Sequence, residues 1–252
     1  MKIAYHIVIP ARMASERLPE KPLADLAGRS LIEHVWRQAL KAAAQSVVIA
    51  TDDERIRIAA SKFGAQVMMT SVQHPSGSDR VAECAVLMGL PPDALVVNLQ
   101  GDEPLMPPEC LDQVAALLAS DARAEAASLY WPLDSAADIR DPNIVKVVTG
   151  LDGAALLFSR SVVPHPRAWS SLQAGLKNGR HWKRHIGLYA YRAAALTAFS
   201  RRSPTVLEQA ERLEQLRILE SGGRIIMAEA CRFIPPGVDT PEDLERMRSM
   251  VK

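Results

Sequence analysis

Short apolar runs alternate with amphipathic segments along the first half of the chain. Residues 3–9 and the ALVVNL run at 94–99 are almost wholly apolar and short, as buried central strands are. The same patterns predict strands at 46–50 and 66–69, and helices at 53–63, at 79–88 and from Pro107 and Pro108 through Leu118. Ser30 with Glu33 three positions later has the spacing of a capping box, so a helix is expected to begin there. This alternation predicts an α/β fold with a mostly parallel central sheet covered by helices on both faces.

The rhythm changes beyond residue 124. Short strands are expected at 126–131, 145–148, 155–158 and 186–191 with less helix between them, which predicts a mixed sheet and an excursion over about 125–205. Residues 162–184 hold prolines and glycines but no clear period. A strongly amphipathic segment at 207–219, a strand at 225–228 and a closing helix at 241–250 complete the chain, which we expect to form a single domain over 1–252.

Composition narrows the class of protein. A chain of 252 residues, 48% of them hydrophobic, is long enough for one large core. Its net charge of +1 offers no overall field for nucleic acid or an anionic membrane, so any anion site has to be local. Three scattered cysteines fit neither a disulfide framework nor a zinc site, and no signal peptide or membrane span is expected from the first residues. A cytoplasmic enzyme or binding protein is the expectation.

The loop after the first strand concentrates positive charge. It reads PARMASERLPEKPLADLAG and places Arg12, Arg17 and Lys21 just beyond the carboxyl end of a central strand, where open α/β sheets bind ligands. Converging cations of this kind suit a nucleoside triphosphate. The loop has neither the Gly-Lys-Ser/Thr ending of a P-loop nor the GxGxxG turn of a dinucleotide site. The alternative is a solvated loop in which acidic residues balance the bases.

Two aspartates are candidate ligands for a divalent cation. Asp102, in QGDEP, follows the second apolar strand directly, and Asp239, in GVDTPEDL, precedes the closing helix. Carboxylates at such positions can hold Mg²⁺ against phosphates. The alternatives are a polar turn for Asp102 and a helix cap for Asp239.

Six motifs occur in an order that resembles one enzyme family. They read PAR-x-x-S-x-R-L-P-x-K-P-L, SGSDR, QGDEP, KRHIGLYAYR, LEQLR and GVDTPEDL, and together they span almost the whole chain. The ordered set is similar to that of the 3-deoxy-manno-octulosonate (Kdo) cytidylyltransferases, or CMP-Kdo synthetases. The resemblance implies a nucleotide-diphospho-sugar transferase fold and a homodimer, with the excursion around 125–205 serving dimerisation and sugar binding. It also implies transfer of CMP from CTP to the anomeric hydroxyl of Kdo. The products would be pyrophosphate and CMP-Kdo for lipopolysaccharide synthesis, and the cofactor Mg²⁺.

The resemblance also implies roles for residues at matching positions. The catalytic set would be Arg12, Lys21, Asp102 and Asp239, with both aspartates holding the metal. The nucleotide-binding set would be Ala11, Arg12, Lys21, Ser78, Arg80 and Gln100. The sugar-binding set would be Arg160, His185, Tyr189, Glu214 and Gln215. Taken without the motifs, His185 also fits an ordinary strand histidine, and Glu214 and Gln215 also fit the wet face of a helix.

Three other functions stay open. The first is the same transfer to 8-amino-Kdo or another sugar acid, and the second is a catalytically silent protein that binds sugar nucleotides. A GT-A glycosyltransferase is the third, although QGDEP is not the Asp-x-Asp motif that such enzymes use.

Two acids depart from the family pattern in the first loop. Glu20 stands where a glycine is usual, and Glu16 where threonine is frequent. If position 20 needs a positive φ, glutamate is strained there by about 1 kcal/mol or more. Because the acid also adds negative charge beside a triphosphate, Glu20→Gly is predicted to lower the KM for CTP in a steady-state assay. An unchanged or higher KM would contradict this prediction.

Overall fold

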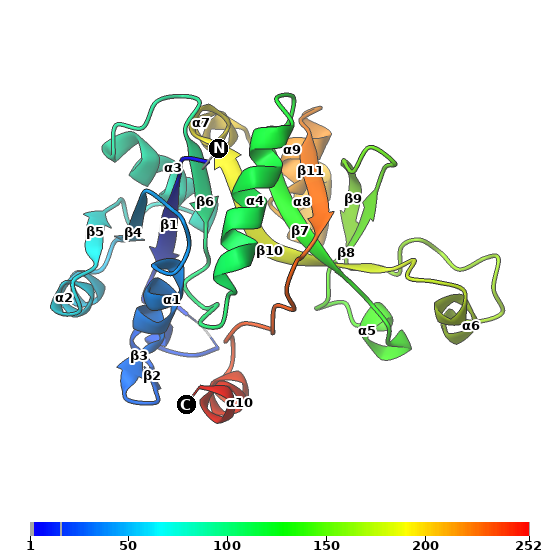
Figure 1. The fold of residues 1–252 in the computed structure, drawn as a ribbon, viewed down its shortest axis with the longest axis horizontal. Coiled ribbons are helices and arrows are strands. Elements are labelled where there is room, and N and C mark those ends of the chain that lie inside the picture. Colours follow the sequence, from blue (N-terminus) through cyan, green and yellow to red (C-terminus); the bar gives the residue numbers. More distant parts are fainter. Residues whose placement is uncertain (1–2, 16, 252) are drawn as a thin grey trace.

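The described part of the chain is built on one nine-stranded sheet. The structure is a computed structural model that describes residues 3–15 and 17–251, and its strand order is β11-β7-β10-β6-β1-β4-β5, with β8 paired to β10 and β9 (Figure 1). The strands of this sheet are β1 (Tyr5–Ala11), β4 (Ser46–Thr51), β5 (Gln66–Met69), β6 (Leu95–Asn98), β7 (Ala126–Pro132), β8 (Lys146–Thr149), β9 (Ala155–Ser159), β10 (Lys183–Arg192) and β11 (Ile225–Glu229). A small hairpin pairs β2 (Asp25–Leu26) with β3 (Arg29–Ser30).

Helices follow most of these strands. They are the 3₁₀ turn η1 (Lys21–Leu23) and the α-helices α1 (Leu31–Ala39), α2 (Glu54–Lys62), α3 (Gly77–Leu87), α4 (Pro108–Ser120), α5 (Ala136–Arg140), α6 (Leu172–Lys177), α7 (Ala193–Arg201), α8 (Val206–Glu211), α9 (Leu216–Glu220) and α10 (Pro241–Met250). Among the described residues, no helix has the length and apolar character needed to cross a membrane.

The predicted mostly parallel, mixed sheet is confirmed. Strand β1 pairs in parallel with β4 and β6, and β4 pairs in parallel with β5. Strand β10 runs antiparallel between β6 and β7, and β11 returns parallel to β7. The reversed strands β9 and β10 both lie beyond residue 124, whereas β7, the first strand after that point, keeps the direction of β6.

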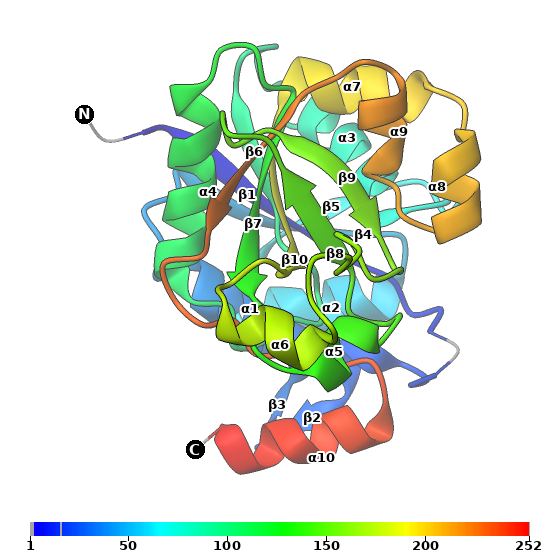
Figure 2. The same ribbon diagram turned by 90° about the vertical axis from the view of Figure 1, so that its right-hand side faces the viewer.

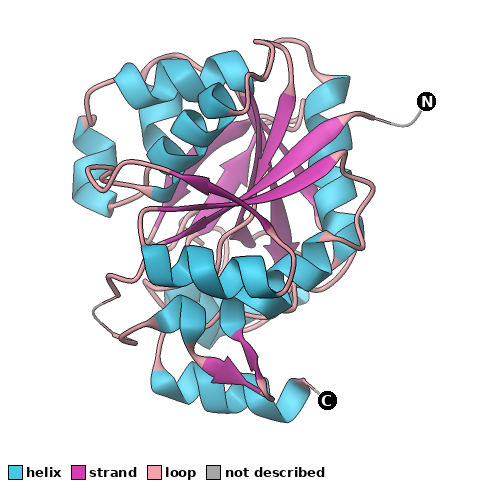
Figure 3. Ribbon diagram, turned by 90° about the vertical axis from the view of Figure 1, so that its left-hand side faces the viewer, coloured by secondary structure: helices cyan, strands magenta, loops and turns pink. Residues whose placement is uncertain are grey.

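Both faces of the sheet are covered. Ile7 and Ile9 of β1 belong to one buried cluster, which includes side chains of α1, α2 and α4. Val8, between them, belongs to a second cluster with side chains of α3, α7 and α9. Figure 3 shows helices on either side of the strands. Burial on both faces explains why β1 and β6 are apolar at nearly every position.

Residues 162–184, which show no clear period in the sequence, contribute to a separate small core. Trp182 is fully buried against Leu133, Ile139 and Leu172, and its indole N–H donates to the carbonyl of Pro164 at 3.0 Å. Helices α5 and α6 enclose this cluster at a distance from the main helices (Figures 1 and 2). These short helices were not predicted, because neither is long enough to show a helical period.

Two local predictions were wrong. The amphipathic segment 207–219 is not continuous, because Arg212 takes the left-handed backbone (φ 52°, ψ 51°) that ends α8 before α9 begins. Ser30 does sit at the start of α1, but its side chain makes no capping hydrogen bond. Helix α7 was also missed, since it follows β10 without a turn residue between them.

A buried ion pair joins α8 to α9. The Nε of Arg217 donates to Oε2 of Glu208 at 2.8 Å, a second bond runs from Nη2 to Oε1, and both side chains are buried. Burial opposes ionisation, but the Arg217 bonds and the Thr205 N–H outweigh it and lower the pKa of Glu208. The pair holds the turn that carries Glu214 and Gln215.

Removing Arg217 is expected to destabilise the protein strongly. Arg217→Met leaves the Glu208 carboxylate buried and unpaired, which costs about 3–5 kcal/mol at neutral pH. Because the folded pKa of Glu208 is depressed, the pair stabilises the fold above the ordinary pKa and loses that contribution as pH falls through the folded value. Urea unfolding at pH 7 and at acid pH should therefore show a smaller difference from the parent in acid. Exposed Arg201→Met is the control, and an equal cost at both pH values would contradict the assignment.

Candidate active site

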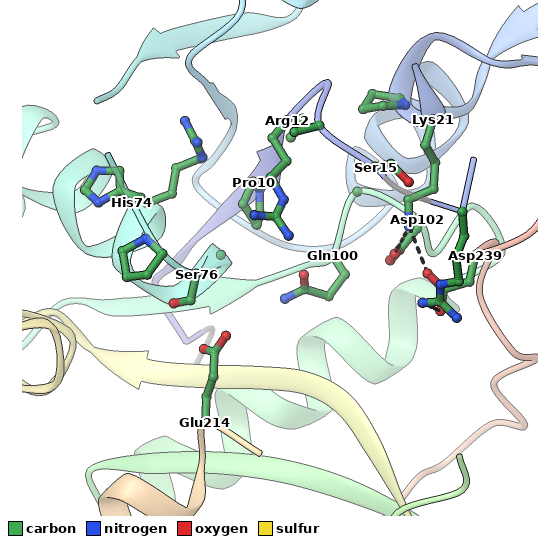
Figure 4. Close-up of a pocket in the computed structure, with 18 residues that line it drawn as sticks. Pro10, Arg12, Ser15, Lys21, His74, Ser76, Gln100, Asp102, Glu214 and Asp239 are labelled. Atoms are coloured by element: carbon green, nitrogen blue, oxygen red, sulfur yellow. Dashed lines mark hydrogen bonds and ion pairs between the residues drawn. The ribbon is translucent and has the colours of Figure 1, made fainter. Parts of the chain in front are cut away.

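A cavity of about 780 Å³ opens where β1 and β6 end. Eight of the predicted site residues line it: Ala11, Arg12, Lys21, Arg80, Gln100, Asp102, Glu214 and Asp239. The remaining lining residues are Pro10, Ala14, Ser15, Arg17, Pro22, His74, Pro75, Ser76, Gly77 and Gly101. Figure 4 shows Lys21 with the two aspartates at one end, Gln100 near the middle, and Ser76, His74 and Glu214 toward the other.

Lys21 links the two predicted metal ligands. Its Nζ donates to Oδ2 of Asp102 at 2.6 Å and to Oδ1 of Asp239 at 3.0 Å. Burial opposes its charge, yet the two carboxylates prevail and raise the pKa of Lys21 above its usual value. Arg17 adds a second cation, with Nη2 lying 3.0 Å from Oδ2 of Asp239. The two aspartates, 137 positions apart in the sequence, thus face one point.

Backbone contacts bring Asp239 to Asp102. The N–H of Val238 donates to the carbonyl of Asp102 at 2.9 Å, so the two segments run side by side at this point. Gly237 permits the approach, because a Cβ there would lie 2.8 Å from the Asp102 carbonyl oxygen and 3.2 Å from the Glu103 carboxyl. Val238 is also fully buried against Leu26 and Leu244, which anchors the segment to the first loop and to α10.

Asp239 does not cap the closing helix. Thr240 is the N-cap of α10, its hydroxyl accepts the Asp243 N–H, and Asp243 returns the bond to complete a capping box. The cap alternative for Asp239 is therefore wrong, and its carboxylate is left to face Lys21 and Arg17. Asp102 does lie in a turn, but its side chain contacts Lys21 and is 29% exposed, so it does not simply face water.

Glu103 carries less charge than its neighbour. Burial, followed by the nearby charge of Asp102, raises the pKa of Glu103 to about 8, although Arg184 acts in the opposite direction. Glu103 therefore keeps its proton over much of the neutral range. The negative charge facing Lys21 belongs to Asp102 and Asp239.

The other end of the cavity is formed by the start of α3 and the end of β6. Ser76 caps α3 by accepting the Asp79 N–H at 3.2 Å, and Gly77 follows it on the cavity wall. Gln100 donates to Asn98 at 3.1 Å. Arg80 lines the cavity, but its guanidinium is engaged by Thr70 at 2.6 Å and Asp52 at 2.8 Å. These groups form a polar wall with fixed donors and acceptors.

Ser78 lies behind this wall. It is buried and does not line the cavity, and its hydroxyl acts against the burial that raises the pKa of Glu214 and of Tyr191. Burial raises the pKa of Glu214, although hydrogen bonds with Ser78 and Ser76 lower it. The structure therefore assigns Ser78 a contact with a cavity residue, not a place on the cavity surface.

The remaining predicted sugar residues, Arg160, His185, Tyr189 and Gln215, do not line the cavity. His185 and Tyr189 lie on β10, with the tyrosine hydroxyl 2.8 Å from Nε2 of the histidine. Burial, aided by the charge of Arg184, lowers the pKa of His185 to about 3, so its ring is neutral at ordinary pH. Arg160 follows β9, and its Nε and Nη1 donate to the carbonyls of Glu211 and Pro142.

Gln215 has an unused donor. Its side chain is buried, and its Nε2 has no hydrogen-bond partner within residues 3–15 and 17–251. A buried donor without an acceptor costs about 1–3 kcal/mol, so it is tolerated best where a ligand can supply the acceptor.

Tyr189 is linked to the cavity lining through β6. It pairs with Asn98 in the sheet, and the Asn98 side chain accepts a hydrogen bond from Gln100, which lines the cavity.

Sequence reasoning missed two residues that shape the site. His74, which contacts Glu83, lines the cavity from the segment before SGSDR, where an isolated histidine gives no signal. Lys146 is fully buried and donates to the carbonyls of Asp141, Ile144 and Arg160 at 2.6–2.9 Å. A lysine inside an apolar strand could have been noticed. Burial, only partly offset by Asp141, lowers its pKa.

The predicted positions therefore fit a cation site of limited ligand number. Within the described chain, no three His, Cys, Asp or Glu side chains gather as a metal-binding set. Asp102 and Asp239 would hold a divalent cation such as Mg²⁺, which proteins usually bind through only one or two carboxylates. Glu16 lies outside the described residues.

Comparison with known proteins gives consistent results. The model of the cytidylyltransferase family matches residues 6–225. A 3-deoxy-manno-octulosonate cytidylyltransferase of Pseudomonas fluorescens is 50% identical over 253 residues, covering all of both chains. The corresponding protein of Pseudomonas syringae pv. syringae is 49% identical, again over all of both chains.

Solved structures agree with these relatives. A CMP:2-keto-3-deoxy-manno-octonic acid synthetase complexed with CTP has a TM-score of 0.86 and 38% identity, over 98% of each chain. A 4-diphosphocytidyl-2C-methyl-D-erythritol synthase, at 13% identity and a TM-score of 0.65 over 99% of each chain, shares the fold alone. The expected nucleotide-diphospho-sugar transferase fold is confirmed, and the chain belongs to the 3-deoxy-manno-octulosonate cytidylyltransferase family.

Proposed function

We propose that the protein transfers CMP from CTP to the anomeric hydroxyl of Kdo, forming CMP-Kdo and pyrophosphate. The observation that carries the proposal is the convergence of Lys21, Asp102 and Asp239 at one end of a cavity whose other end is a polar wall. Full-length relatives named as Kdo cytidylyltransferases, and a similar structure complexed with CTP, support it.

The residues divide between the two substrates. Arg12 and Lys21 would bind the phosphates, and the cytidine would be surrounded by Ala11, Arg80 and Gln100. Ser78 would influence the cytidine site indirectly, through its interaction with Glu214. Arg160, His185, Tyr189, Glu214 and Gln215 would bind the sugar acid. A neutral His185 and the unused Gln215 donor suit a ligand rich in hydroxyls.

Positioning and charge neutralisation account for the chemistry. The sugar hydroxyl attacks the α-phosphorus of CTP in line with the departing pyrophosphate, and the cations of the first loop face the charge that leaves. None of the proposed site residues is a Ser or Cys nucleophile with an adjacent base, so no covalent enzyme intermediate is part of the proposal.

Asp102 and Asp239 would hold Mg²⁺. Both offer the carboxylate oxygens that Mg²⁺ prefers, and their contact with one shared ammonium supports a cation between them. Bound Mg²⁺ would offset negative charge on the phosphate oxygens. Lys21 would then release the aspartates and turn to the phosphates.

The protein is also proposed to act as a homodimer in the cytoplasm. Leu151 and Leu156, at the turn and on β9 of the β8–β9 hairpin, are exposed, as expected of a surface that meets a second copy. The three cysteines form no disulfide, which suits a reducing compartment. Sedimentation at the mass of a single chain would contradict the dimer.

Pyrophosphate release tests the function directly. With CTP, Mg²⁺ and Kdo the parent should release pyrophosphate, while ATP, GTP or UTP in place of CTP should give little product. Replacing Kdo with 8-amino-Kdo or a sialic acid tests which sugar acid is the acceptor.

Asp102→Ala should lower kcat by at least about a hundredfold, the scale of losing one electrostatic stabiliser of the transition state. Near-normal turnover in this variant would refute the role of Asp102, and CTP binding without turnover in the parent would favour a silent binding protein.

Metal binding without nucleotide tests the two-aspartate site separately. Lys21→Met removes the ammonium that both carboxylates contact, so Mn²⁺ should bind at least about tenfold more tightly than to the parent. Electron paramagnetic resonance of free Mn²⁺ measures this without any turnover. Asp239→Asn should weaken binding, and exposed Lys41→Met is the control. Unchanged or weaker binding in Lys21→Met would argue against a metal between the aspartates.

A further inference from the structure

Glu20, the residue before Lys21, adopts a backbone that glutamate disfavours. Its φ of 53° and ψ of 27° are left-handed, and its carbonyl accepts the Leu23 N–H at 2.9 Å to close the turn η1. A residue with a Cβ disfavours this conformation, so other contacts have to hold it. The direction in which Lys21 leaves this turn depends on it.

Arg55, on the first turn of α2, is held in place by the neighbouring Asp53. Its Nε and Nη2 donate to the two carboxylate oxygens of Asp53 at 3.1 and 2.8 Å. Asp53 in turn caps α2 by accepting the Arg55 N–H at 2.8 Å, and its own N–H donates to Thr51 at the end of β4. Arg55 is therefore oriented by a central strand.

The remaining guanidinium nitrogen of Arg55 reaches the first loop. Its Nη1 donates to Oε1 of Glu20 at 2.7 Å, across 35 positions of sequence. Glu20 does not line the cavity, because this bond turns its carboxylate toward α2. The charge-based reason for expecting Glu20→Gly to lower the KM for CTP is thereby removed.

We propose that Arg55 is a positioning residue for CTP binding, which by holding the left-handed Glu20 sets the direction of Lys21 toward the phosphates. The turn at the end of β4 would then position two residues for the cavity. Asp53 orients Arg55, and Asp52 accepts a hydrogen bond from Arg80, which lines the cavity. A glycine at position 20 adopts the left-handed backbone without assistance. Dependence on Arg55 is therefore specific to a chain with glutamate at this position, and the inference rests on the proposed use of CTP.

A double-mutant cycle separates this role from simple stabilisation of α2. Arg55→Ala should raise the KM and the Kd for CTP about two- to fivefold, the scale of an exposed ion pair, with kcat changed by less than about twofold. The increase should shrink as salt is raised, because the pair is exposed. Glu20→Gln should give a similar increase, Arg55→Lys should fail to restore binding, and Glu20→Gly alone should stay near the parent.

The decisive arm is Arg55→Ala combined with Glu20→Gly. In that background the loss of Arg55 should no longer change the KM or the Kd, and Arg57→Ala, which breaks an exposed pair on the same helix, should change neither in any background. Equal increases with Glu20 and with glycine would show that Arg55 acts only through Asp53 and would overturn the proposal, as would no increase in either. Failure of the proposed function would appear differently, as a parent that neither binds nor uses CTP.

Discussion

The ammonium of Lys21 between two carboxylates is the contact on which the site depends. Lys21 comes from the first loop, Asp102 from the end of β6 and Asp239 from the segment before α10, so three distant parts of the chain meet at one charge. The ammonium offsets the repulsion between the partly buried Asp102 carboxylate and the half-exposed Asp239 carboxylate. The proposed Mg²⁺ site lies at the same position.

The rest of the fold can be understood as support for this meeting point. Parallel pairing of β1 and β6 brings their carboxyl ends to one edge, which places the first loop beside QGDEP. The hydrogen bond from Val238 to Asp102 and the burial of Val238 then bring the last segment to the same place. Thr240 serves as the cap of α10, so Asp239 is available to the site.

Buried polar contacts hold the residues proposed to bind the sugar acid. Lys146 binds three backbone carbonyls, one of them from Arg160, and the Glu208–Arg217 pair fixes the turn with Glu214 and Gln215. Such groups are costly when unpaired and rigid when satisfied. Gln215 Nε2 is one of four buried side-chain atoms without a partner among the described residues, with Arg202 Nη1, Thr205 Oγ1 and Arg224 Nη2, and it alone of these belongs to the proposed sugar-binding set. The first loop differs, since its left-handed Glu20 depends on an exposed pair with Arg55.

The sequence by itself determined the α/β alternation, most element positions and the family, because periodic burial and ordered motifs are local properties of the chain. It also placed Arg12, Lys21 and Asp102 near one sheet edge, since strand ends can be read from apolar runs. Only the tertiary structure decided that Asp239 faces Lys21, that Arg80 is engaged by Asp52, and that Ser78 lies behind the cavity wall. It alone also divided 207–219 at Arg212 and directed Glu20 to Arg55. These facts depend on contacts between residues far apart in the chain, and local patterns of polarity carry no record of such contacts.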